Sequence, residues 1–281
     1  MHRIISVVTP TYNGTDFLIP AMESVVGQRG DFYIHYHIQD GGSTDDTPSV
    51  IEDWIRKNRN RSYACKGVSI TLASEKDSGM YQAINRGFSQ LPVSESTLMT
   101  WINADDLIAY DAFATAFAAI RDIPEIDWLC SQLALVDEAG NITNRWDPGT
   151  YSRTKLRHGL YTGRNGLPFV QQEGTFWRPK LWKAVGGLNE SFRLAGDWDL
   201  WRRFADFSSA TVLEATTGFH RRRSGQLSAD LSRYHQEVDA YLATLAIPDM
   251  PTPEAIQRIA YNPEKRSWQP IACPATTMSS T

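Results

Sequence analysis

The sequence predicts an α/β fold with a mostly parallel central sheet flanked by helices. Two observations lead to this prediction. In the first hundred residues, short apolar runs rich in β-branched residues alternate with helical patterns. Each of these runs ends in turn-forming or polar residues. Because parallel strands need a long crossover between them, usually a helix, this alternation is typical of a doubly wound sheet covered on both faces.

The expected elements follow from these patterns in chain order. Strands are predicted at residues 4–8, 33–38, 68–72 and 98–102, with helices between them at residues 16–26, 44–57 and 78–88. Beyond Tyr110 the alternation is less regular. Helices are predicted there at 111–121, 179–185, 196–207 and 227–245, strands at 128–136 and 142–146, and a Gly- and Arg-rich loop at 151–168. Sheets of this kind bind ligands at the carboxyl ends of their strands, so we expect the polar residues behind the first four strands to converge.

The composition is ordinary for a globular protein and gives no global attraction for nucleic acid. The 281 residues include 42% hydrophobic and 21% charged residues, which suits a domain with a substantial core. The net charge of −4 means that any anion must be bound locally. Three widely spaced cysteines favour a reducing compartment over a disulfide framework or a zinc site. With no signal-peptide pattern and no apolar stretch of about 18 residues, we expect a cytoplasmic location.

The most informative segment is residues 101–106, where an apolar run stops at the adjacent carboxylates of Asp105 and Asp106. Two neighbouring carboxylates repel, and Mg²⁺ or Mn²⁺ prefers oxygen ligands, so the pair indicates a cation site that could hold a diphosphate. A turn in which one aspartate caps the helix that begins near Tyr110 explains the same residues. This segment alone leaves both interpretations open.

Three further segments follow the first three strands. Residues 9–14 form a turn that could present an aromatic ring and an amide to a flat ligand, or simply a plain turn. In residues 39–47 the glycines permit close backbone approach, and Asp40 could accept hydrogen bonds from a uracil-like base or a ribose. In residues 75–87, Arg86 lies about two turns into a helix and could reach a phosphate, with a solvated arginine as the alternative.

Together with residues 103–106, these segments occur in an order and spacing that resemble the family 2 glycosyltransferases, inverting enzymes with the GT-A fold. The resemblance extends from about Ile4 to Ser228. It implies a nucleoside diphosphate sugar donor, with a UDP-sugar favoured, and a divalent cation, Mn²⁺ or Mg²⁺, held by Asp105 and Asp106. The implied donor contacts are Thr9, Tyr12, Asn13, Asp40, Asp77, Arg86, Asn103 and Asp105.

Residues 195–203 resemble the family's segment in which an acid precedes an Asp-x-Asp-Leu run, which implies that Asp197 is the catalytic base. An inverting transfer needs one carboxylate to deprotonate the acceptor hydroxyl and no second carboxylate as nucleophile. This chain carries Gly196 where many members have Glu, which leaves Asp197 as the candidate. The structural alternative is an acid that simply favours the helix N-terminus.

Two other segments resemble the acceptor side of the family. Residues 171–178 resemble its acceptor-side strand. Trp198 and Trp201 would suit stacking on sugar faces, with core packing as the alternative.

Residues 219–228 depart from the family pattern. Many relatives carry a His just before a Gly-Gln-x-Ser stretch, and here Arg222 or Arg223 lies nearest that place. Either His220 takes this role after a shift of register, or the arginines bind the diphosphate directly. A solvated face or an attachment to anionic lipid headgroups is the alternative interpretation of the arginines.

The resemblance also implies an organisation and a set of partners. Residues 1–107 would be the donor-binding half and residues 108–247 the half with the acceptor site and the base, within one domain. Residues 248–281 form a Pro/Ser/Thr-rich tail that we expect to be weakly ordered or draped on the surface. The expected acceptor is a glycan or a lipid-linked saccharide, in polysaccharide biosynthesis. The resemblance allows peripheral contact with the inner face of the cell membrane and a homo-oligomer, and no nucleic acid partner is expected.

Two other functions compete with a transferase. A nucleotidyltransferase shares the sheet and the acidic pair, but this chain has no Gly-rich N-terminal loop with a basic residue for a triphosphate. A non-catalytic binding protein for sugar nucleotides or glycans is the second alternative. The intact acids Asp105, Asp106 and Asp197 argue against it, and only turnover excludes it.

Overall fold

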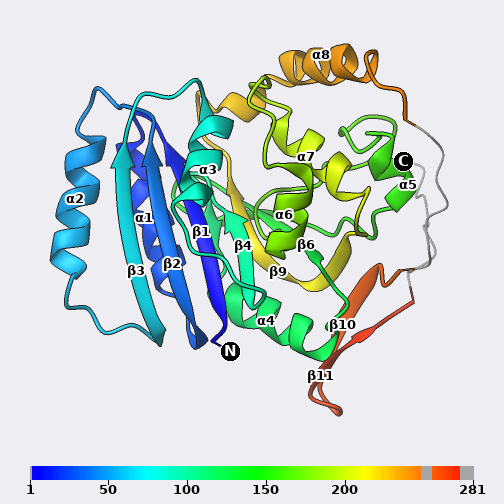
Figure 1. Cartoon of the computed structure of the whole chain (residues 1–281), viewed down its shortest axis with the longest axis horizontal. Coiled ribbons are helices and arrows are strands. Elements are labelled where there is room, and N and C mark those ends of the chain that lie inside the picture. Colours follow the sequence, from blue (N-terminus) through cyan, green and yellow to red (C-terminus); the bar gives the residue numbers. More distant parts are fainter. Residues whose placement is uncertain (1, 248–254, 273–281) are drawn as a thin grey trace.

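The computed structural model describes residues 2–247 and 255–272, which build an eleven-stranded sheet with helices on both faces (Figure 1). The strand order is β11-β10-β9-β6-β8-β4-β1-β2-β3, with β5 paired to β9 and β7 paired to β6. The first strands are β1 (Ile4–Thr11), β2 (Gly30–Asp40), β3 (Cys65–Ser74) and β4 (Thr97–Trp101), and they pair in parallel. The predicted fold class, a mostly parallel sheet flanked by helices, is confirmed.

The helices between these strands lie close to where the pattern predicts them. They are α1 (Thr15–Val26), α2 (Thr47–Asn58) and α3 (Met80–Ser89). The second helix begins three residues later than expected, because the Asp45 carboxylate accepts the backbone N–H of Thr47 and holds the preceding residues in a turn.

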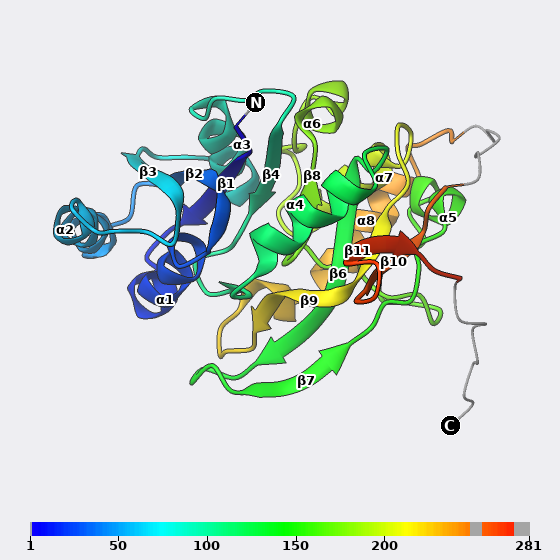
Figure 2. The same ribbon diagram turned by 90° about the horizontal axis from the view of Figure 1, so that it is seen from below.

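The second half contains further expected elements, most of them at the predicted bounds, and only the last two helices are shorter than expected. They are α4 (Ala112–Asp122), β6 (Trp128–Val136), β7 (Ile142–Trp146), α6 (Pro179–Val185), α7 (Gly196–Phe204) and α8 (Leu231–Leu242). A 3-10 turn, η1 (Leu227–Ala229), precedes α8, because the Asp230 side chain accepts the N–H of Arg233 and caps a new helix there. The expected loop at 151–168 contains a short helix, α5 (Arg153–Arg157). Strands β6 and β7 extend as a hairpin (Figure 2).

Within residues 2–247 the apolar patterns missed three strands, of which β9 (Thr211–Arg221) matters most. The others are β5 (Leu107–Ile108) and β8 (Phe176–Trp177). Strand β9 begins with the buried run Thr211–Leu213, but its later residues mix buried and half-exposed positions and end in His220 and Arg221. Its register with β6 also shifts twice, so its sequence shows no regular alternation. It runs parallel to β6 and pairs antiparallel with β5. The end of β9 therefore lies beside the segment that follows β4.

The expectation of a weakly ordered tail is wrong for the described part of residues 248–281. Strands β10 (Arg258–Asn262) and β11 (Ser267–Pro270) form a hairpin, and β10 adds to the sheet beside β9. Ile259 and Trp268 are buried in the core, and Arg258 forms an ion pair with Asp147 at 2.6 Å, which lowers the pKa of that carboxyl to about 2. Residues 248–254 and 273–281 lie outside the described residues.

The sheet separates two apolar cores. One contains side chains from α1, α2 and α4, and the other contains side chains from α3, α6, α7 and α8. In the second core four tryptophans pack together: the rings of Trp101 and Trp128 both stack on Trp201 at 5.6 Å between centroids, and Trp177 meets Trp201 edge-on. Trp201 is thus a core residue, as the packing alternative predicts. Within residues 2–247 and 255–272, no helix is long and apolar enough to cross a bilayer.

Trp201→Ala should destabilise the fold by about 3–5 kcal/mol, because it removes the ring on which two others stack and leaves a cavity. Urea unfolding measures the change as a lower midpoint. Phe207→Ala is the control, since Phe207 is exposed just beyond the same helix and its loss should change stability by about 0.5 kcal/mol or less. Equal stability of Trp201→Ala and the wild type would contradict the packing role.

Candidate functional site

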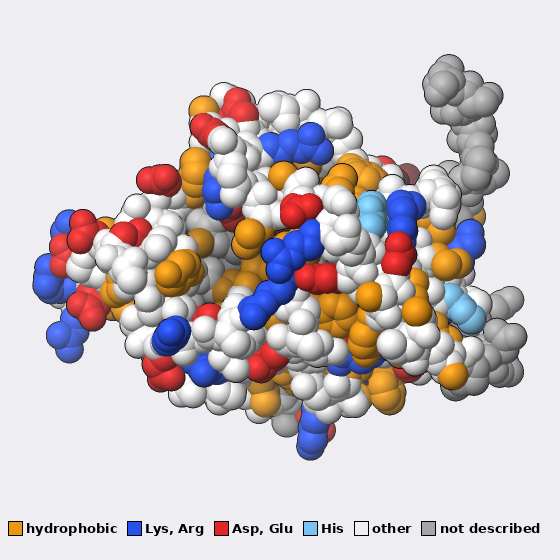
Figure 3. Space-filling model, turned by 90° about the horizontal axis from the view of Figure 1, so that it is seen from above, with side chains coloured by type: hydrophobic (Ala, Val, Ile, Leu, Met, Phe, Trp, Pro, Cys, Tyr) orange, Lys and Arg blue, Asp and Glu red, His pale blue; other side chains and the backbone are white. Residues whose placement is uncertain are grey.

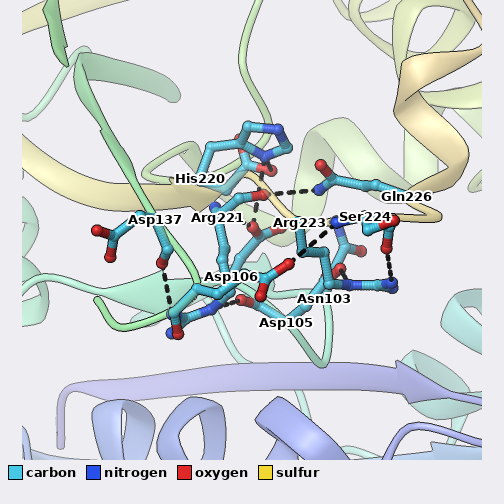
Figure 4. Close-up of polar contacts among 11 residues, drawn as sticks. Asn103, Asp105, Asp106, Asp137, His220, Arg221, Arg223, Ser224 and Gln226 are labelled. Carbon is cyan, nitrogen blue, oxygen red and sulfur yellow. Dashed lines mark hydrogen bonds and ion pairs between the residues drawn. The ribbon is translucent and has the colours of Figure 1, made fainter. Parts of the chain in front are cut away.

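The segments that follow β1, β2 and β4 lie at the carboxyl edge of the parallel strands, where the end of β9 joins them. Seen from this side, basic and acidic side chains lie next to each other on the surface (Figure 3). In the close-up, Asn103, Asp105 and Asp106 face His220, Arg221 and Arg223 (Figure 4). The predicted convergence of polar side chains at this edge is therefore present in the structure.

Asp106 is the centre of this cluster and is 0% exposed. Its Oδ1 accepts the backbone N–H of Arg221 at 2.8 Å and lies 3.3 Å from Nδ1 of His220. Its Oδ2 accepts the side-chain amide of Asn103 at 3.1 Å. Burial, with the nearby carboxylate of Glu173, raises the pKa of Asp106 to about 6. A fully buried carboxylate of this kind requires a positive partner.

His220 and Glu173 complete the cluster. Nδ1 of His220 is 3.3 Å from Oε1 of Glu173, and ligand atoms of Asp106, Glu173 and His220 all lie within 4.8 Å of one another. Burial acts to lower the pKa of His220, but the two carboxylates outweigh it and raise that pKa to about 11. The imidazolium thus balances part of the buried negative charge. Oε2 of Glu173 is buried and meets no hydrogen-bond partner among the described residues.

Asp105 does not belong to this cluster, although the sequence pairs it with Asp106 as a cation ligand. Its Oδ2 accepts Nε of Arg223 at 2.7 Å, and its backbone carbonyl accepts Nε of Arg221. Burial raises the pKa of Asp105, and the ion pair with Arg223 opposes this shift. The structure therefore separates the two adjacent aspartates: Asp106 faces His220, and Asp105 faces an arginine.

The structure separates the candidate residues of the segment 219–228. His220 on β9 points to Asp106 and Glu173, whereas Arg223 pairs with Asp105. Arg222 is exposed and lines an open groove of about 570 Å³ together with Asp137, Glu138, Ala139, Arg223 and Ser224. The histidine and the two arginines thus face different parts of the same edge.

The residues predicted to contact a nucleoside lie around the first two loops. Thr9 is buried and accepts the hydroxyl of Tyr36, while the Tyr12 ring is 61% exposed and available to a flat ligand. Asn13 joins the two loops, because its backbone N–H donates to Ser43 and its Oδ1 accepts the N–H of Thr44. These loops therefore form one wall of the site.

Asp40 is fully buried and accepts hydrogen bonds from its own loop and from the end of β3. The donors are the backbone N–H groups of Gly42 and Ser43 and the hydroxyls of Ser43 and Ser74. The Asp40 carboxylate therefore shapes this loop.

Asp77 lies in the loop that follows β3, and Arg86 lies in the next helix, α3. Burial raises the pKa of Asp77, while its Oδ1 accepts the N–H of Gly79. The Arg86 guanidinium donates to the backbone carbonyl of Lys76 at 3.0 Å and lies 3.8 Å from Glu75. In the structure Arg86 thus holds the loop before α3.

Asp197 lies in the first turn of α7. It is partly exposed, but its Oδ1 is buried and meets no hydrogen-bond partner in the described part of the chain. Burial raises the pKa of this carboxyl to about 7, with a smaller contribution from the charge of Glu173. The side chain borders a small cavity of about 20 Å³, lined mainly by aromatic and apolar residues that include Tyr161, Phe169 and Tyr234. Such a carboxyl is suited to exchange a proton near neutral pH.

The glycine at position 196 has a steric cause. A Cβ there would lie 2.6 Å from the ring of Tyr81, so the glutamate that many relatives carry does not fit. The carboxylate of Glu237 on α8 accepts the backbone N–H groups of Arg193, Leu194 and Ala195. The turn before Asp197 is therefore fixed by another helix.

Trp198 differs from the expectation that it stacks on a sugar. It is 5% exposed, and its indole N–H donates to the carbonyl of Gly159 at 3.1 Å. Its ring packs edge-on against Phe192 and Tyr241. Trp198 is a core residue because its ring fills the space between α7, the loop at 151–168 and α8.

Sequence reasoning missed Glu173. A single glutamate in an irregular segment carries no periodic signal, and only its place within residues 171–178 pointed to this region. Its contact with His220 depends on β9, which the patterns also missed.

Asp197→Asn should stabilise the protein increasingly between about pH 4 and pH 7. The folded-state pKa of about 7 lies above the unfolded value of about 3.9, so the wild type loses stability as the pH rises through this window. The asparagine has no such loss, so the difference in unfolding free energy should level off above pH 7. Urea midpoints measured from pH 4.5 to 8 test this, and a difference that does not change with pH would contradict the raised pKa.

The chain matches known proteins over most of its length. The family model described as "Glycosyl transferase family 2" matches residues 6–181. The PGL/p-HBAD biosynthesis glycosyltransferase of Mycobacterium tuberculosis (strain ATCC 25177 / H37Ra) is 28% identical over 199 residues, which cover 70% of this chain and 67% of that protein. Chondroitin synthase of Escherichia coli is 21% identical over 204 residues, which cover 72% of this chain and 26% of that protein.

Solved structures share the fold. TarS 1-349 of S. aureus, in complex with UDP-GlcNAc, aligns with a TM-score of 0.62 at 17% identity and covers 86% of this chain. The mannosyltransferase PcManGT of Pyrobaculum calidifontis, in complex with GDP-Man and Mn²⁺, aligns with a TM-score of 0.59 at 16% identity and covers 88%. The match spans 66% of each of those two chains. On the family match, which extends over more than half of its residues, this chain belongs to glycosyl transferase family 2.

Proposed function

We propose that this glycosyltransferase moves a sugar from a nucleoside diphosphate sugar, with a UDP-sugar favoured, to a hydroxyl of a glycan or lipid-linked acceptor, with inversion at the anomeric carbon. The observation that carries the proposal is one site with two parts. In the first part, the neighbouring side chains of Asp106 and His220 can hold a cation. In the second part, the partly exposed carboxyl of Asp197 has a pKa of about 7. Glu173 contacts the first part and influences the pKa of the second, so both parts lie within electrostatic reach.

Asp106 and His220 are suited to hold a divalent cation. Carboxylate oxygens and an imidazole nitrogen are ordinary ligands for such ions, and the unpartnered Oε2 of Glu173 marks unused acceptor capacity beside them. A bound cation would act as a Lewis acid that neutralises the charge of the leaving diphosphate. The Mn²⁺ of PcManGT, a protein of the same fold, supports this assignment.

The loops after β1 and β2 are the proposed nucleoside site. Tyr12 offers an exposed ring, and Asn13 ties the two loops into one wall. Asp77 and Asp105 are the nearby acids proposed to accept hydrogen bonds from the sugar or ribose hydroxyls. Arg223 would then move from Asp105 to the diphosphate, because a phosphate carries more charge than a carboxylate.

Asp197 is the proposed general base. In its ionised form it would take the proton from the acceptor hydroxyl as the oxygen attacks the anomeric carbon. The reaction then proceeds in one displacement and needs no covalent glycosyl-enzyme. The similarity to a chondroitin synthase supports a glycan as the acceptor. Membership of the family disfavours the nucleotidyltransferase alternative.

Asp197→Asn should lower the rate of sugar transfer by about 10²–10⁴-fold, because this is the usual contribution of a general base. Donor binding should stay unchanged, since the substitution keeps the shape of the side chain. Transfer from a labelled donor and calorimetric titration with UDP and Mn²⁺ measure the two effects. Asp53→Asn on the exposed face of α2 is the control with the same chemical change. Turnover by Asp197→Asn at the wild-type rate would remove the base assignment.

The rate of transfer should fall below about pH 7 with a slope of one proton. The base works only when ionised, and burial raises its pKa to about 7, so lowering the pH removes the active form. A profile of kcat/KM from pH 5 to 9 checks this. A flat profile across this range would show that no group with such a pKa takes part.

A further inference from the structure

We infer that Glu173 is a third protein ligand of the divalent cation, so that Asp106, Glu173 and His220 bind the cation before any nucleotide arrives. The inference rests on the proposed function for the use of that cation. Glu173 comes from the segment before β8, far in sequence from both β4 and β9, and its side chain ends beside the Asp106–His220 contact. Neither the sequence patterns nor the resemblance assigned it a role.

The spacing of the three side chains suits cation ligands. Nδ1 of His220 is 3.3 Å from Oδ1 of Asp106 and 3.3 Å from Oε1 of Glu173. Neighbouring ligands in an octahedron with bonds of about 2.1 Å are about 3 Å apart. The two distances from His220 are close to this value, and the ligand atoms of all three side chains lie within 4.8 Å of one another, so small shifts would let one cation bind them. Three positions would remain for phosphate oxygens and water.

The backbone is built to bring Glu173 to β9. Gly174 has a φ of +82°, and a Cβ there would lie 2.5 Å from Oγ1 of Thr217. A Cβ on Gly218 would lie 2.5 Å from the carbonyl carbon of Glu173. Thr217 completes the contact by donating its hydroxyl to the carbonyl of Gly174 at 3.1 Å. Two glycines thus permit the close approach that directs the Glu173 side chain to His220.

Burial and charge favour a cation at this place. Glu173 is 5% exposed, and its Oε2 is buried without a hydrogen-bond partner in residues 2–247 and 255–272, an arrangement that costs free energy unless a ligand satisfies it. His220 must release its proton for Nδ1 to bind the cation, and the carboxylates of Asp106 and Glu173 then carry two negative charges, which match the charge of Mg²⁺ or Mn²⁺. Asp105 cannot supply the second charge, because it pairs with Arg223.

Binding of Mn²⁺ alone tests the inference. Mn²⁺ is titrated into the full chain without nucleotide, and the free ion is followed by its electron paramagnetic resonance signal. The wild type should bind one Mn²⁺, and Glu173→Gln should bind it at least tenfold more weakly. Glu125→Gln removes an exposed acid in the loop before β6 and should leave the affinity unchanged. Circular dichroism and the unfolding temperature show that each variant is folded.

Gly218→Ala is a second variant that keeps every ligand. Its added Cβ should push the Glu173 backbone away and also weaken Mn²⁺ binding. Equal Mn²⁺ affinity of the wild type and Glu173→Gln would overturn the inference, as would a folded wild type that binds Mn²⁺ only when UDP is present. In the second case the proposed function survives, because the cation would then arrive with the donor. Full transfer activity in excess EDTA would instead contradict the cation in the proposed function itself.

Discussion

The burial of the Asp106 carboxylate is the constraint on which the rest of the site depends. A carboxylate with no contact to water needs several donors and a positive neighbour, and no single element of this chain could supply them. Asp106 follows β4, yet it accepts the backbone N–H of Arg221 at the end of β9 and lies against His220. The two halves of the chain are therefore joined at the same point where the cation would bind. Changes that disturb this junction should affect both the fold and the chemistry.

The junction also explains why residues adjacent in the sequence have different partners. Asp105 and Asp106 are adjacent in the sequence, but they leave the strand end in different directions and meet different partners. Arg221 and Arg223 pair with Asp105 through its carbonyl and its carboxylate, and His220 is left to Asp106. Asp197 lies on α7. Burial is the main cause of its raised pKa, and the charge of Glu173 contributes less. Asp105, Asp106 and Asp197 therefore have different partners and surroundings.

The sequence predicts the first half of the fold well because β-branched strands and amphipathic helices alternate there with clear turn residues. It does not predict β9, whose middle is half-exposed and whose register is irregular, nor the hairpin of β10 and β11, where only Ile259 and Trp268 point to the core. The same limits apply to the site. The motifs name Asp106, His220 and Asp197 as candidates, but Glu173 contacts His220 through a tertiary contact that no local pattern encodes. Trp198 shows the opposite failure, since this aromatic residue beside the proposed base is part of the core.

The most direct test of the account is thermal unfolding with UDP-, GDP-, dTDP- and CMP-sugars, each in the presence of Mn²⁺, Mg²⁺ or EDTA. A ligand at 100 times its dissociation constant stabilises the folded state by about 2.7 kcal/mol, which gives a readily measured shift. We expect a higher unfolding temperature with one class of nucleotide sugar, a UDP-sugar, and loss of that shift in EDTA. No shift with any nucleotide sugar would contradict the claim that this edge of the sheet binds a donor through a cation.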